Sequence, residues 1–380
     1  MEFFILENEV GKYNYVVLGA GAQGVAVAYD LAKHGNVQSL ILADADAKKA
    51  HEGALHVNAL VHPPIVAPRV LDVNNKRELT QLFEGADAVV SAISFSFNEM
   101  LTDMAVHFGV HMVDLGGNTA VVQSQHKRND RALRAGVTII PDCGMGPGFN
   151  LSLANSALRA FPKLTSLAVY CGGLPQKPEG QLKYTLPFSL QGLVNEYSGF
   201  ADILQNGKIK QKPCLGSVEK ISLELGEFEA SYTSGGLSTA PWTYQVAYPT
   251  LQNLKYMTLR YPGHWKLLRK FRLAGKLREE LESRLGSTPK EFADIGIILV
   301  QGEGVDASGR KVFVTRKVVD VYDEKTGFTA MQRLTGFHAS IMVICATEER
   351  IPKGVLAVEM INGDMIISEM AKRGIVTLNS

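Results

Sequence analysis

Residues 14–44 constrain the fold more strongly than any other stretch of the sequence. An apolar run leads into a glycine-rich turn, apolar residues then recur at helical spacing over 25–33, and a second apolar run over 40–43 ends at Asp44. The turn follows the pattern G-x-G-x-x-G, and it contains Gly19, Gly21, Ala22, Gln23 and Gly24. Strand, glycine turn, helix and strand in this order predict a βαβ unit with a dinucleotide site at its turn.

Each part of the turn has a physical task in such a site. Gly19 permits a tight turn, Gly21 lets a pyrophosphate approach the backbone, and Gly24 lets the helix pack close to the strand. The helix N-terminus, which includes Ala22 and Gln23, offers free N–H groups and a partial positive charge to the phosphates. A plain βαβ unit with an empty turn is the alternative, and the acid after the second apolar run argues against it.

Asp44 is the expected partner of the adenosine ribose, because it ends the second apolar run, and Asp46 is the alternative. The residues after Asp44 are Ala45, Asp46 and Ala47, so a 2′-phosphate would meet negative charge instead of an Arg or Lys. The sequence therefore favours NAD over NADP as the cofactor.

Apolar strand-like runs and helical segments alternate through residue 148. The strands are expected over 65–71, 86–93, 110–115 and 137–140, and the helices over 47–58, 76–83, 98–109 and 122–135. This alternation predicts the α/β class with a doubly wound parallel (Rossmann) sheet, and 1–148 is expected to be the NAD-binding domain. Asp72, Ser94 and Asp114 follow strands at the edge where such sheets bind ligands, although Asp72 could equally cap the next helix.

The pattern changes after residue 148. Helices are expected over 150–161, 190–204 and most of 252–285, strands over 164–171, 182–186, 221–225 and 228–233, and an antiparallel meander over 295–301, 311–322 and 328–334. Residues 149–336 are therefore expected to form an α+β domain for substrate binding and dimerisation, with a mixed or antiparallel sheet. Residues 337–380, with helices over 339–347 and 365–373, are expected to return to the first domain.

Composition argues against several classes of partner. The formal net charge is +1 and charged residues make up 20% of the chain, which gives no sign of binding to nucleic acid or an anionic membrane. The basic residues between 255 and 278 are interpreted as a solvated helix face. No stretch approaches the ~20 apolar residues of a membrane span, and the four cysteines lack the spacing of a zinc site. A cytoplasmic protein without a metal or disulfides is expected.

Several loop segments together resemble the saccharopine dehydrogenase superfamily, and within it the lysine 6-dehydrogenase branch. They are Asp142–Gly148, Cys171–Gly180, Leu259–His264 and Lys353–Val355 with Glu359. The resemblance covers nearly the whole chain and implies NAD-dependent oxidation of the ε-amine of L-lysine with release of ammonia. The product would be 2-aminoadipate 6-semialdehyde, which cyclises to piperideine-6-carboxylate. The resemblance also implies a homodimer or larger homo-oligomer.

Oxidation of an amine by hydride transfer needs a neutral amine, an activated water and groups that hold the amino-acid end. Asp142 is a candidate base or partner of the ammonium, His264 a candidate neutral base at a helix N-terminus, and Tyr184 a candidate hydrogen-bond donor. Each has a structural alternative. Asp142 could cap a helix or order its loop, His264 could be a cap or a packed residue, and Tyr184 could be a core aromatic.

Other candidates lie close to these residues or to the expected cleft. Lys177 and Arg260 are candidates to bind the substrate carboxylate, and Thr239 to donate a hydrogen bond, although a single Lys or Arg is more often a surface charge. Cys143, in a loop near the expected cofactor, lies next to Asp142. A thiol nucleophile would imply aldehyde oxidation, but no histidine partner is evident nearby, so a small residue in a tight loop is the simpler interpretation.

Two other functions stay open at the level of the sequence. A reductase of the same fold could join or split a secondary amine such as saccharopine, with glutamate or another amine as product in place of ammonia. A regulatory or assembly protein would bind NAD without turnover.

Overall fold

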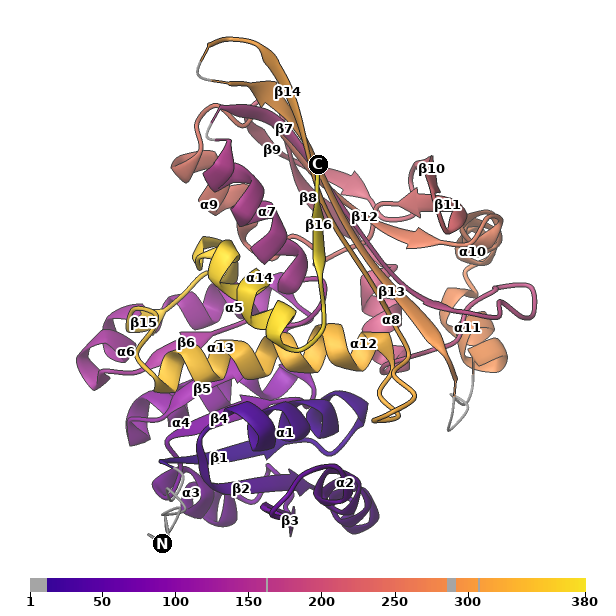
Figure 1. Cartoon of the computed structure of the whole chain (residues 1–380). Coiled ribbons are helices and arrows are strands. Elements are labelled where there is room, and N and C mark those ends of the chain that lie inside the picture. Colours follow the sequence, from indigo (N-terminus) through magenta and orange to yellow (C-terminus); the bar gives the residue numbers. More distant parts are fainter. Residues whose placement is uncertain (1–11, 162, 286–291, 307) are drawn as a thin grey trace, which may run out of the picture.

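The computed structural model describes residues 12–161, 163–285, 292–306 and 308–380. Two sheets form its frame, and the first has the strand order β15-β6-β5-β4-β1-β2-β3 (Figure 1). These strands are β1 (Tyr13–Leu18), β2 (Val37–Asp44), β3 (Val66–Val70), β4 (Ala88–Ser91), β5 (His111–Asp114), β6 (Thr138–Ile140) and β15 (Gly354–Val355). All neighbours are parallel, which confirms the predicted Rossmann sheet.

Helices cover both faces of the first sheet. They are α1 (Ala22–His34), α2 (Ala47–Leu60), α3 (Lys76–Glu84), α4 (Asn98–Phe108), α5 (Thr119–His126), α6 (Asn129–Ala135) and α13 (His338–Thr347), with a 3-10 turn at Phe95–Phe97. On β1, Tyr15 and Val17 share a core with α1, α2 and α13, whereas Val16 and Leu18 share one with α3 and α4. This two-sided burial explains why the strands are continuous apolar runs. The helix predicted over 122–135 is divided into α5 and α6.

The second sheet has the order β10-β11-β12-β7-β13-β14-β16, and the hairpin of β8 and β9 lies beside β12. Its strands are β7 (Leu164–Pro175), β8 (Phe200–Gln205), β9 (Lys208–Pro213), β10 (Val218–Leu223), β11 (Gly226–Ser231), β12 (Asn253–Arg260), β13 (Asp294–Val305), β14 (Lys311–Val321) and β16 (Thr377–Asn379). β12 and β7 are parallel and the other neighbours are antiparallel, so the sheet is mixed, as predicted.

The two faces of the second sheet are covered differently. One face packs against α7 (Phe149–Ala160). On the other face, Phe228 of β11 and Leu299 of β13 share a core. On the same side, an ion pair connects the β10–β11 hairpin to β14. Glu224, at the tip of the hairpin, lies 2.5 Å from the Nζ of Lys317.

Two predicted elements of the second half are wrong around residue 190. Residues 182–186 form a loop, in which Leu182 and Tyr184 are buried in a core shared with α10 (His264–Leu273). The helix predicted over 190–204 is α8 (Leu190–Glu196), and β8 follows it. The apolar alternation over 182–186 therefore reflects packing of a loop on a local core, which sequence periodicity does not distinguish from strand pairing.

The helix predicted over 252–285 is wrong in its first part, because Asn253–Arg260 is β12, an interior strand of the second sheet. Lys255, which suggested a solvated basic helix, lies on this strand and forms an ion pair with Glu219 of β10 at 2.5 Å. The rest of the segment is helical as predicted, in α10 and α11 (Leu277–Leu285).

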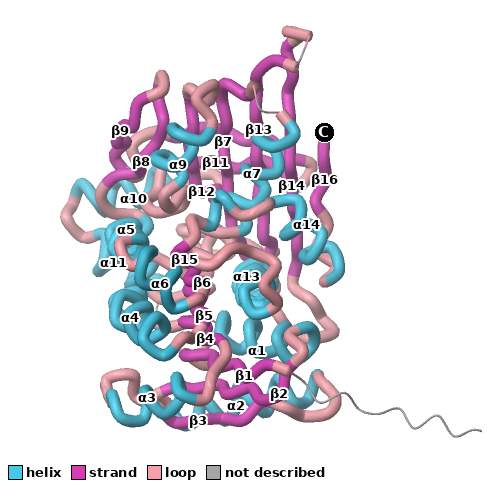
Figure 2. The backbone as a smooth tube through the Cα atoms, turned by 90° about the vertical axis from the view of Figure 1, so that its left-hand side faces the viewer, coloured by secondary structure: helices cyan, strands magenta, loops and turns pink. Residues whose placement is uncertain are grey.

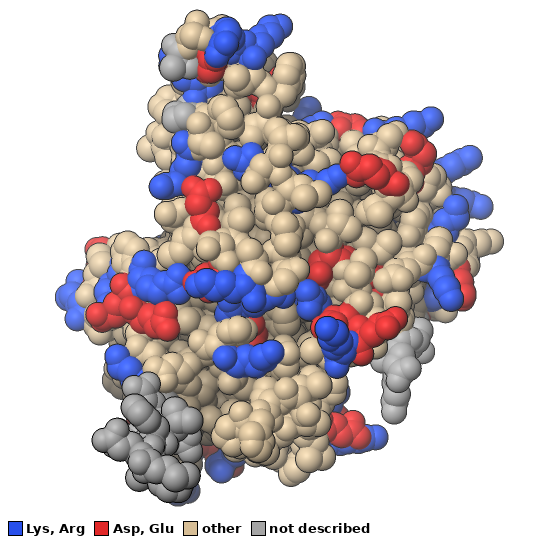
Figure 3. Space-filling view, in the orientation of Figure 1, with Lys and Arg blue, Asp and Glu red and all other residues tan. Residues whose placement is uncertain are grey.

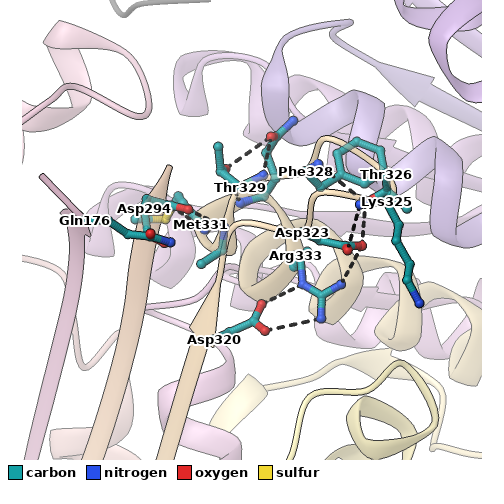
Figure 4. Close-up of polar contacts among 12 residues, drawn as sticks. Gln176, Asp294, Asp320, Asp323, Lys325, Thr326, Phe328, Thr329, Met331 and Arg333 are labelled. Atoms are coloured by element: carbon teal, nitrogen blue, oxygen red, sulfur yellow. Dashed lines mark hydrogen bonds and ion pairs between the residues drawn. The ribbon is translucent and has the colours of Figure 1, made fainter. Parts of the chain in front are cut away.

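The strand predicted over 328–334 is also wrong, because α12 (Ala330–Gln332) begins there and continues into the π-helical turn η2 (Arg333–Phe337) and α13. Thr329 caps α12, and its hydroxyl and the Gln332 side chain form a capping box. Figure 4 shows the joint with the second sheet, where Asp294 accepts hydrogen bonds from the N–H groups of residues 330 and 331 at 2.6 and 2.9 Å. Burial raises the pKa of Asp294 to about 6.

The C-terminal segment contacts both halves of the molecule. α13 packs against β4, β5 and α1, and Figure 2 views it nearly end-on beside α1. Gly336 permits the close approach of η2 to α1, because a Cβ atom there would lie 2.6 Å from the Cβ of Ala26. β15 joins the first sheet, whereas α14 (Gly363–Lys372) packs on α7 and β16 pairs with β14.

Charged side chains of both signs are interspersed over the face shown in Figure 3. In the basic helix α10, Arg269 donates to the carbonyl of Leu215 at 2.6 Å, and Arg272 donates to that of Cys214. Part of the basic run therefore holds the fold together instead of facing water. Among the described residues, no helix is both long and apolar enough to cross a membrane.

Candidate functional site

A cavity of about 1100 Å³ lies between the carboxyl end of the first sheet and the second sheet. Its first end is lined by the glycine turn, by Ser94 after β4 and by Gly116 after β5. Its other end is lined by side chains of α8, β12 and nearby loops, including Tyr184, Asn195, Glu196, Ser234, Tyr256, Thr258 and Arg260. The loop 144–147 and residues of α12 and η2 line the space between the two ends. The cavity therefore joins the expected cofactor turn to a polar cluster of the second sheet.

The glycine turn presents backbone atoms to the cavity. Gly21 is the N-cap of α1, and a Cβ atom on it would meet nothing within 4 Å. Gly24 is packed tightly, because a Cβ atom there would lie 1.8 Å from the carbonyl oxygen of Gly19. Ala22 and Gln23 also line the cavity, and the Gln23 Oε1 is buried without a partner among the described residues. An open helix N-terminus beside a side-chain-free backbone fits the pyrophosphate of a dinucleotide.

Asp44 is held at this turn. Its Oδ2 accepts a hydrogen bond from the Ala20 N–H at 2.8 Å, and its Oδ1 accepts one from the Asp46 N–H at 2.9 Å. Asp46 instead caps α2, where it accepts from the N–H groups of Lys48 and Lys49. The Lys49 side chain, which the sequence argument did not consider, lines the cavity from α2. The cofactor end of the cavity therefore includes a cation, and the residues fit NAD or NADP.

Among the other expected cofactor residues, Ser94 lines the cavity, and Asp72 and Asp114 are not among the described residues that line it. Asp72 is exposed and accepts a hydrogen bond from the Asn74 N–H at 2.9 Å, so it orders the turn before α3. Asp114 is fully buried and accepts hydrogen bonds from the N–H groups of Gly116 at 2.8 Å and Asp142 at 3.2 Å. It therefore orders the two loops at the cavity floor.

Asp142 lies directly behind the cavity wall. It is 1% exposed, its φ of +62° is in the left-handed region, and a Cβ atom on Gly116 would lie 1.6 Å from its Oδ1. Burial and the neighbouring Asp114 raise the pKa of Asp142 to about 7. Cys143 is also buried, its thiol lies 3.4 Å from the Ile140 carbonyl oxygen, and burial raises its pKa well above the usual range. The thiol is therefore a packed group, in line with the simpler interpretation of the sequence.

Arg260 and Glu196 form the charged centre of the second end. The Arg260 side chain is 3% exposed and the Glu196 side chain 20%, and Nη2 of the first lies 3.6 Å from Oε1 of the second. Thr258 donates a hydrogen bond to the same Oε1 at 3.0 Å. Burial raises the pKa of Glu196, and Arg260 and Thr258 oppose this rise. The pair offers a cation and an acceptor side by side at the cavity wall.

Tyr184 and His264 lie next to this pair in different ways. The Tyr184 ring stacks on the Arg260 guanidinium at 4.4 Å, and its buried hydroxyl, at the cavity wall, has no partner in the described part of the chain. His264 opens α10 as expected, but it is 1% exposed and is not among the described residues of the cavity wall. Burial and Arg260 lower the pKa of His264 to about 3. This position does not support the expected role of His264 as a base.

The two remaining substrate candidates lie away from the described cavity wall. Thr239 precedes α9 (Ala240–Ala247) and donates to Oε1 of the buried Glu359 at 2.7 Å, so its hydroxyl joins two segments of the fold. Lys177 is exposed in the loop after β7. Neither position supports the expected contact with substrate.

Most residues of the second end, including Glu196, Tyr256 and Thr258, are not among those predicted from the sequence. A signal for three of its residues was present, because Tyr256, Thr258 and Arg260 alternate and so share one face of a strand. The assignment of this segment to a helix concealed that face. Glu196 was placed inside a helix predicted to continue to 204, although it is the last residue of α8.

Comparison with known proteins places the chain in a family. A family model described as the saccharopine dehydrogenase NADP binding domain matches residues 15–140, and one described as the saccharopine dehydrogenase C-terminal domain matches residues 144–375. A solved structure of apo saccharopine dehydrogenase (L-Glu forming) from Saccharomyces cerevisiae has a TM-score of 0.78 at 17% identity, over 97% of this chain and 99% of that chain.

Other solved structures are less similar. GenD2 from gentamicin A biosynthesis, in complex with NAD, has a TM-score of 0.43 at 10% identity over 98% of this chain and 97% of that one. A myo-inositol dehydrogenase from Corynebacterium glutamicum has a TM-score of 0.42 at 11% identity over 97% and 98% of the two chains. These values support no inference about this protein. The two family models together match most of the sequence, and the chain belongs to the saccharopine dehydrogenase family of oxidoreductases.

Proposed function

We propose that this protein is an NAD-dependent dehydrogenase that oxidises the ε-amine of L-lysine and releases ammonia. The observation that carries the proposal is the pair of Arg260 and Glu196 at the end of the cavity opposite the glycine turn. Arg260 would bind the α-carboxylate, and Glu196 would accept hydrogen bonds from the α-ammonium. The side chain of the amino acid would then extend toward the cofactor end.

The charges of the cavity favour a substrate with one carboxylate. Among the described lining residues, the Lys and Arg side chains are Arg260 and Lys49, and Lys49 belongs to α2 at the cofactor end. Saccharopine carries three carboxylates, and with one of them on Arg260 the other two would find no further Lys or Arg among the described lining residues except Lys49 at the cofactor end. A zwitterionic amino acid with a basic side chain matches the pair better, because buried charges need partners.

The chain's own residues would prepare both reactants. The glycine turn would hold the pyrophosphate and Asp44 the ribose, and the bound cofactor supplies the hydride acceptor. Apolar walls such as Met145, Pro147 and Met331 would favour the neutral amine that hydride transfer needs. Hydride transfer would leave an imine, and water entering the cavity would hydrolyse it to the aldehyde and ammonia. The Tyr184 hydroxyl, which is buried without a described partner, is available to donate a hydrogen bond to the substrate.

The test is turnover of a substrate series by the purified protein with NAD or NADP, followed by the absorbance of the reduced cofactor and by ammonia release. L-lysine should give both signals. 6-Aminohexanoate, which lacks the α-amine, and cadaverine, which lacks the carboxylate, should each be poorer by at least about tenfold in kcat/KM. Glutamate release from saccharopine without activity on lysine would replace the proposal by a secondary-amine dehydrogenase. Cofactor binding without turnover of any amine would indicate a regulatory protein.

A further inference from the structure

We propose that His264 is a positioning residue, which fixes the Arg260 guanidinium through Tyr197 and ties the Tyr184 loop to the same point. The inference rests on the proposed role of Arg260 as the carboxylate site. It assigns His264 a task that requires no proton transfer with the substrate.

A continuous chain of hydrogen bonds carries the inference. His264 Nδ1 lies 2.7 Å from the Leu182 carbonyl oxygen, and its Nε2 lies 3.2 Å from the Tyr197 hydroxyl. The same hydroxyl accepts a hydrogen bond from Arg260 Nε at 2.9 Å. The imidazole is thus the joint between a loop of the cavity wall and the guanidinium at the cavity end.

The chemistry of the partners fixes the direction of each bond. A carbonyl oxygen only accepts, so His264 Nδ1 carries the proton that is donated to Leu182. Arg260 only donates, so the Tyr197 oxygen accepts from it, and the Tyr197 hydroxyl proton is free to go to the unprotonated Nε2 of His264. Every donor then meets an acceptor in a single arrangement with a neutral imidazole.

The surroundings keep this arrangement free of water. His264 is 1% exposed and Tyr197 is fully buried, and the rings of Tyr184 and Trp265 contact the imidazole edge-on at 5.6 and 5.1 Å. The charged neighbour is Arg260, which opposes a second positive charge on the imidazole. Glu196, whose Oε1 lies 3.6 Å from Arg260 Nη2, is the counterion of Arg260. A histidine in this position is a poor proton shuttle and a rigid support.

The support acts on the geometry of the carboxylate site. Arg260 Nε is committed to Tyr197 and its Nη1 donates to the Leu259 carbonyl at 2.9 Å, which fixes the plane of the guanidinium. Binding of a carboxylate depends on that plane, because its strong contacts are directional. The Leu182 anchor also precedes Tyr184 and the loop residues 187–189 of the cavity wall. Loss of the joint should therefore weaken amino-acid binding and leave the cofactor end intact.

Two variants test the joint. His264→Asn retains an amide donor near Nδ1 but has no group at Nε2, and Tyr197→Phe removes the shared hydroxyl. Each should raise KM for L-lysine about tenfold, lower kcat by less than about threefold and leave NAD affinity by calorimetry unchanged. kcat/KM for cadaverine should barely change, because it has no carboxylate for Arg260 to bind. His51→Asn, an exposed histidine whose Nδ1 also contacts a carbonyl oxygen, is the matched control and should behave as wild type.

The outcomes separate this inference from the proposed function. A His264→Asn variant that loses kcat on lysine and cadaverine alike, together with one limb of the pH profile, would show a base and overturn the positioning role. A wild type that turns over no lysine contradicts the proposed function instead. In that case the ¹⁵N shifts of His264 still decide the inference. A neutral Nδ1–H tautomer from pH about 5 to about 9 supports it, and titration in that range contradicts it.

Discussion

The two ends of the cavity are built by different means. The glycine-turn end uses backbone atoms of six neighbouring residues, Gly19–Gly24, and depends on the absence of a side chain at its glycines. The Arg260 end uses side chains from α8 and the loop that precedes it, and from β12, which is distant from both in the sequence. The first end is therefore encoded by one local motif, of a type common to dinucleotide-binding sites. The second end is assembled only by the tertiary fold, and the proposed function assigns substrate binding to it.

The two ends also differ in how a single substitution would disturb them. At the turn, an added side chain meets either open space or a backbone atom, depending on the glycine. At the other end, removal of one partner leaves a buried charge without its counterion, which costs more than the pair contributes.

The largest effect is expected for Arg260→Met. Loss of the cation should destabilise the protein by about 3 kcal/mol, because the Glu196 side chain, which is only 20% exposed, loses its counterion. It should also lower kcat/KM for lysine at least about 100-fold. Chemical denaturation and steady-state kinetics measure the two effects. Adding Glu196→Gln should restore part of the stability but none of the lysine affinity. Equal stability of the single variant and wild type would show that the pair is not effectively buried.

Gly24→Ala should destabilise the folded protein by about 3 kcal/mol, because its methyl group would meet the Gly19 carbonyl oxygen and a backbone atom cannot move aside. Thermal unfolding measures the loss. Gly21→Ala is the matched control, since its methyl group enters open space. This variant should fold normally. Its affinity for NAD, measured by calorimetry, should nevertheless fall at least about tenfold, because the pyrophosphate needs the space that the methyl group fills. Normal cofactor affinity in Gly21→Ala would place the phosphates elsewhere.

Asp142→Asn should change how stability depends on pH. The carboxyl has a folded pKa of about 7 against a usual value of 3.8, so the folded state holds the proton more tightly. In the wild type, the contribution of this carboxyl to the free energy of unfolding is at its maximum below pH about 4. It is lost as the pH rises toward 7. The variant has no such loss, and at pH 8 it should be more stable by on the order of 2 kcal/mol. Parallel curves of unfolding temperature against pH for the two proteins would refute this expectation.

The smallest effect is expected at the two acids near the ribose site. Asp46→Ala removes the cap of α2 and should cost about 1 kcal/mol of stability with unchanged NAD affinity. Asp44→Ala should instead weaken NAD binding about tenfold. Calorimetry on both variants distinguishes the two acids. The reverse result would make Asp46 the ribose partner.

The part of the fold that could be predicted is the part with local signals. The alternation of runs such as 40–43 and 86–93 with helices predicted the parallel sheet, because strands covered on both faces are continuously apolar. Part of the glycine turn lines one end of the cavity, and Asp44 accepts a hydrogen bond from the Ala20 N–H of that turn. Their positions follow from neighbours in the chain.

The rest depended on distant contacts. Residues 253–260 carry a lysine and an arginine that suggest a solvated helix, yet Lys255 is paired with Glu219 and Arg260 with Glu196, both far along the chain. Likewise, Thr239 and His264 are candidates for substrate binding and catalysis by sequence. In the structure, however, the Thr239 hydroxyl is hydrogen-bonded to Glu359 and the His264 imidazole to Tyr197. Sequence patterns show which residues are polar, and only the tertiary structure shows which of them are already satisfied.

The path of the chain between the sheets has a consequence for attempts to divide this protein. The polypeptide passes to the second sheet through α7, returns through α12 and α13, and leaves again through α14 to end in β16. An N-terminal fragment would lack α13 and β15, and would expose apolar surface of β4 and β5 to water. The half that contains the first sheet should therefore not fold when it is expressed alone, and the two halves should unfold together in one cooperative transition.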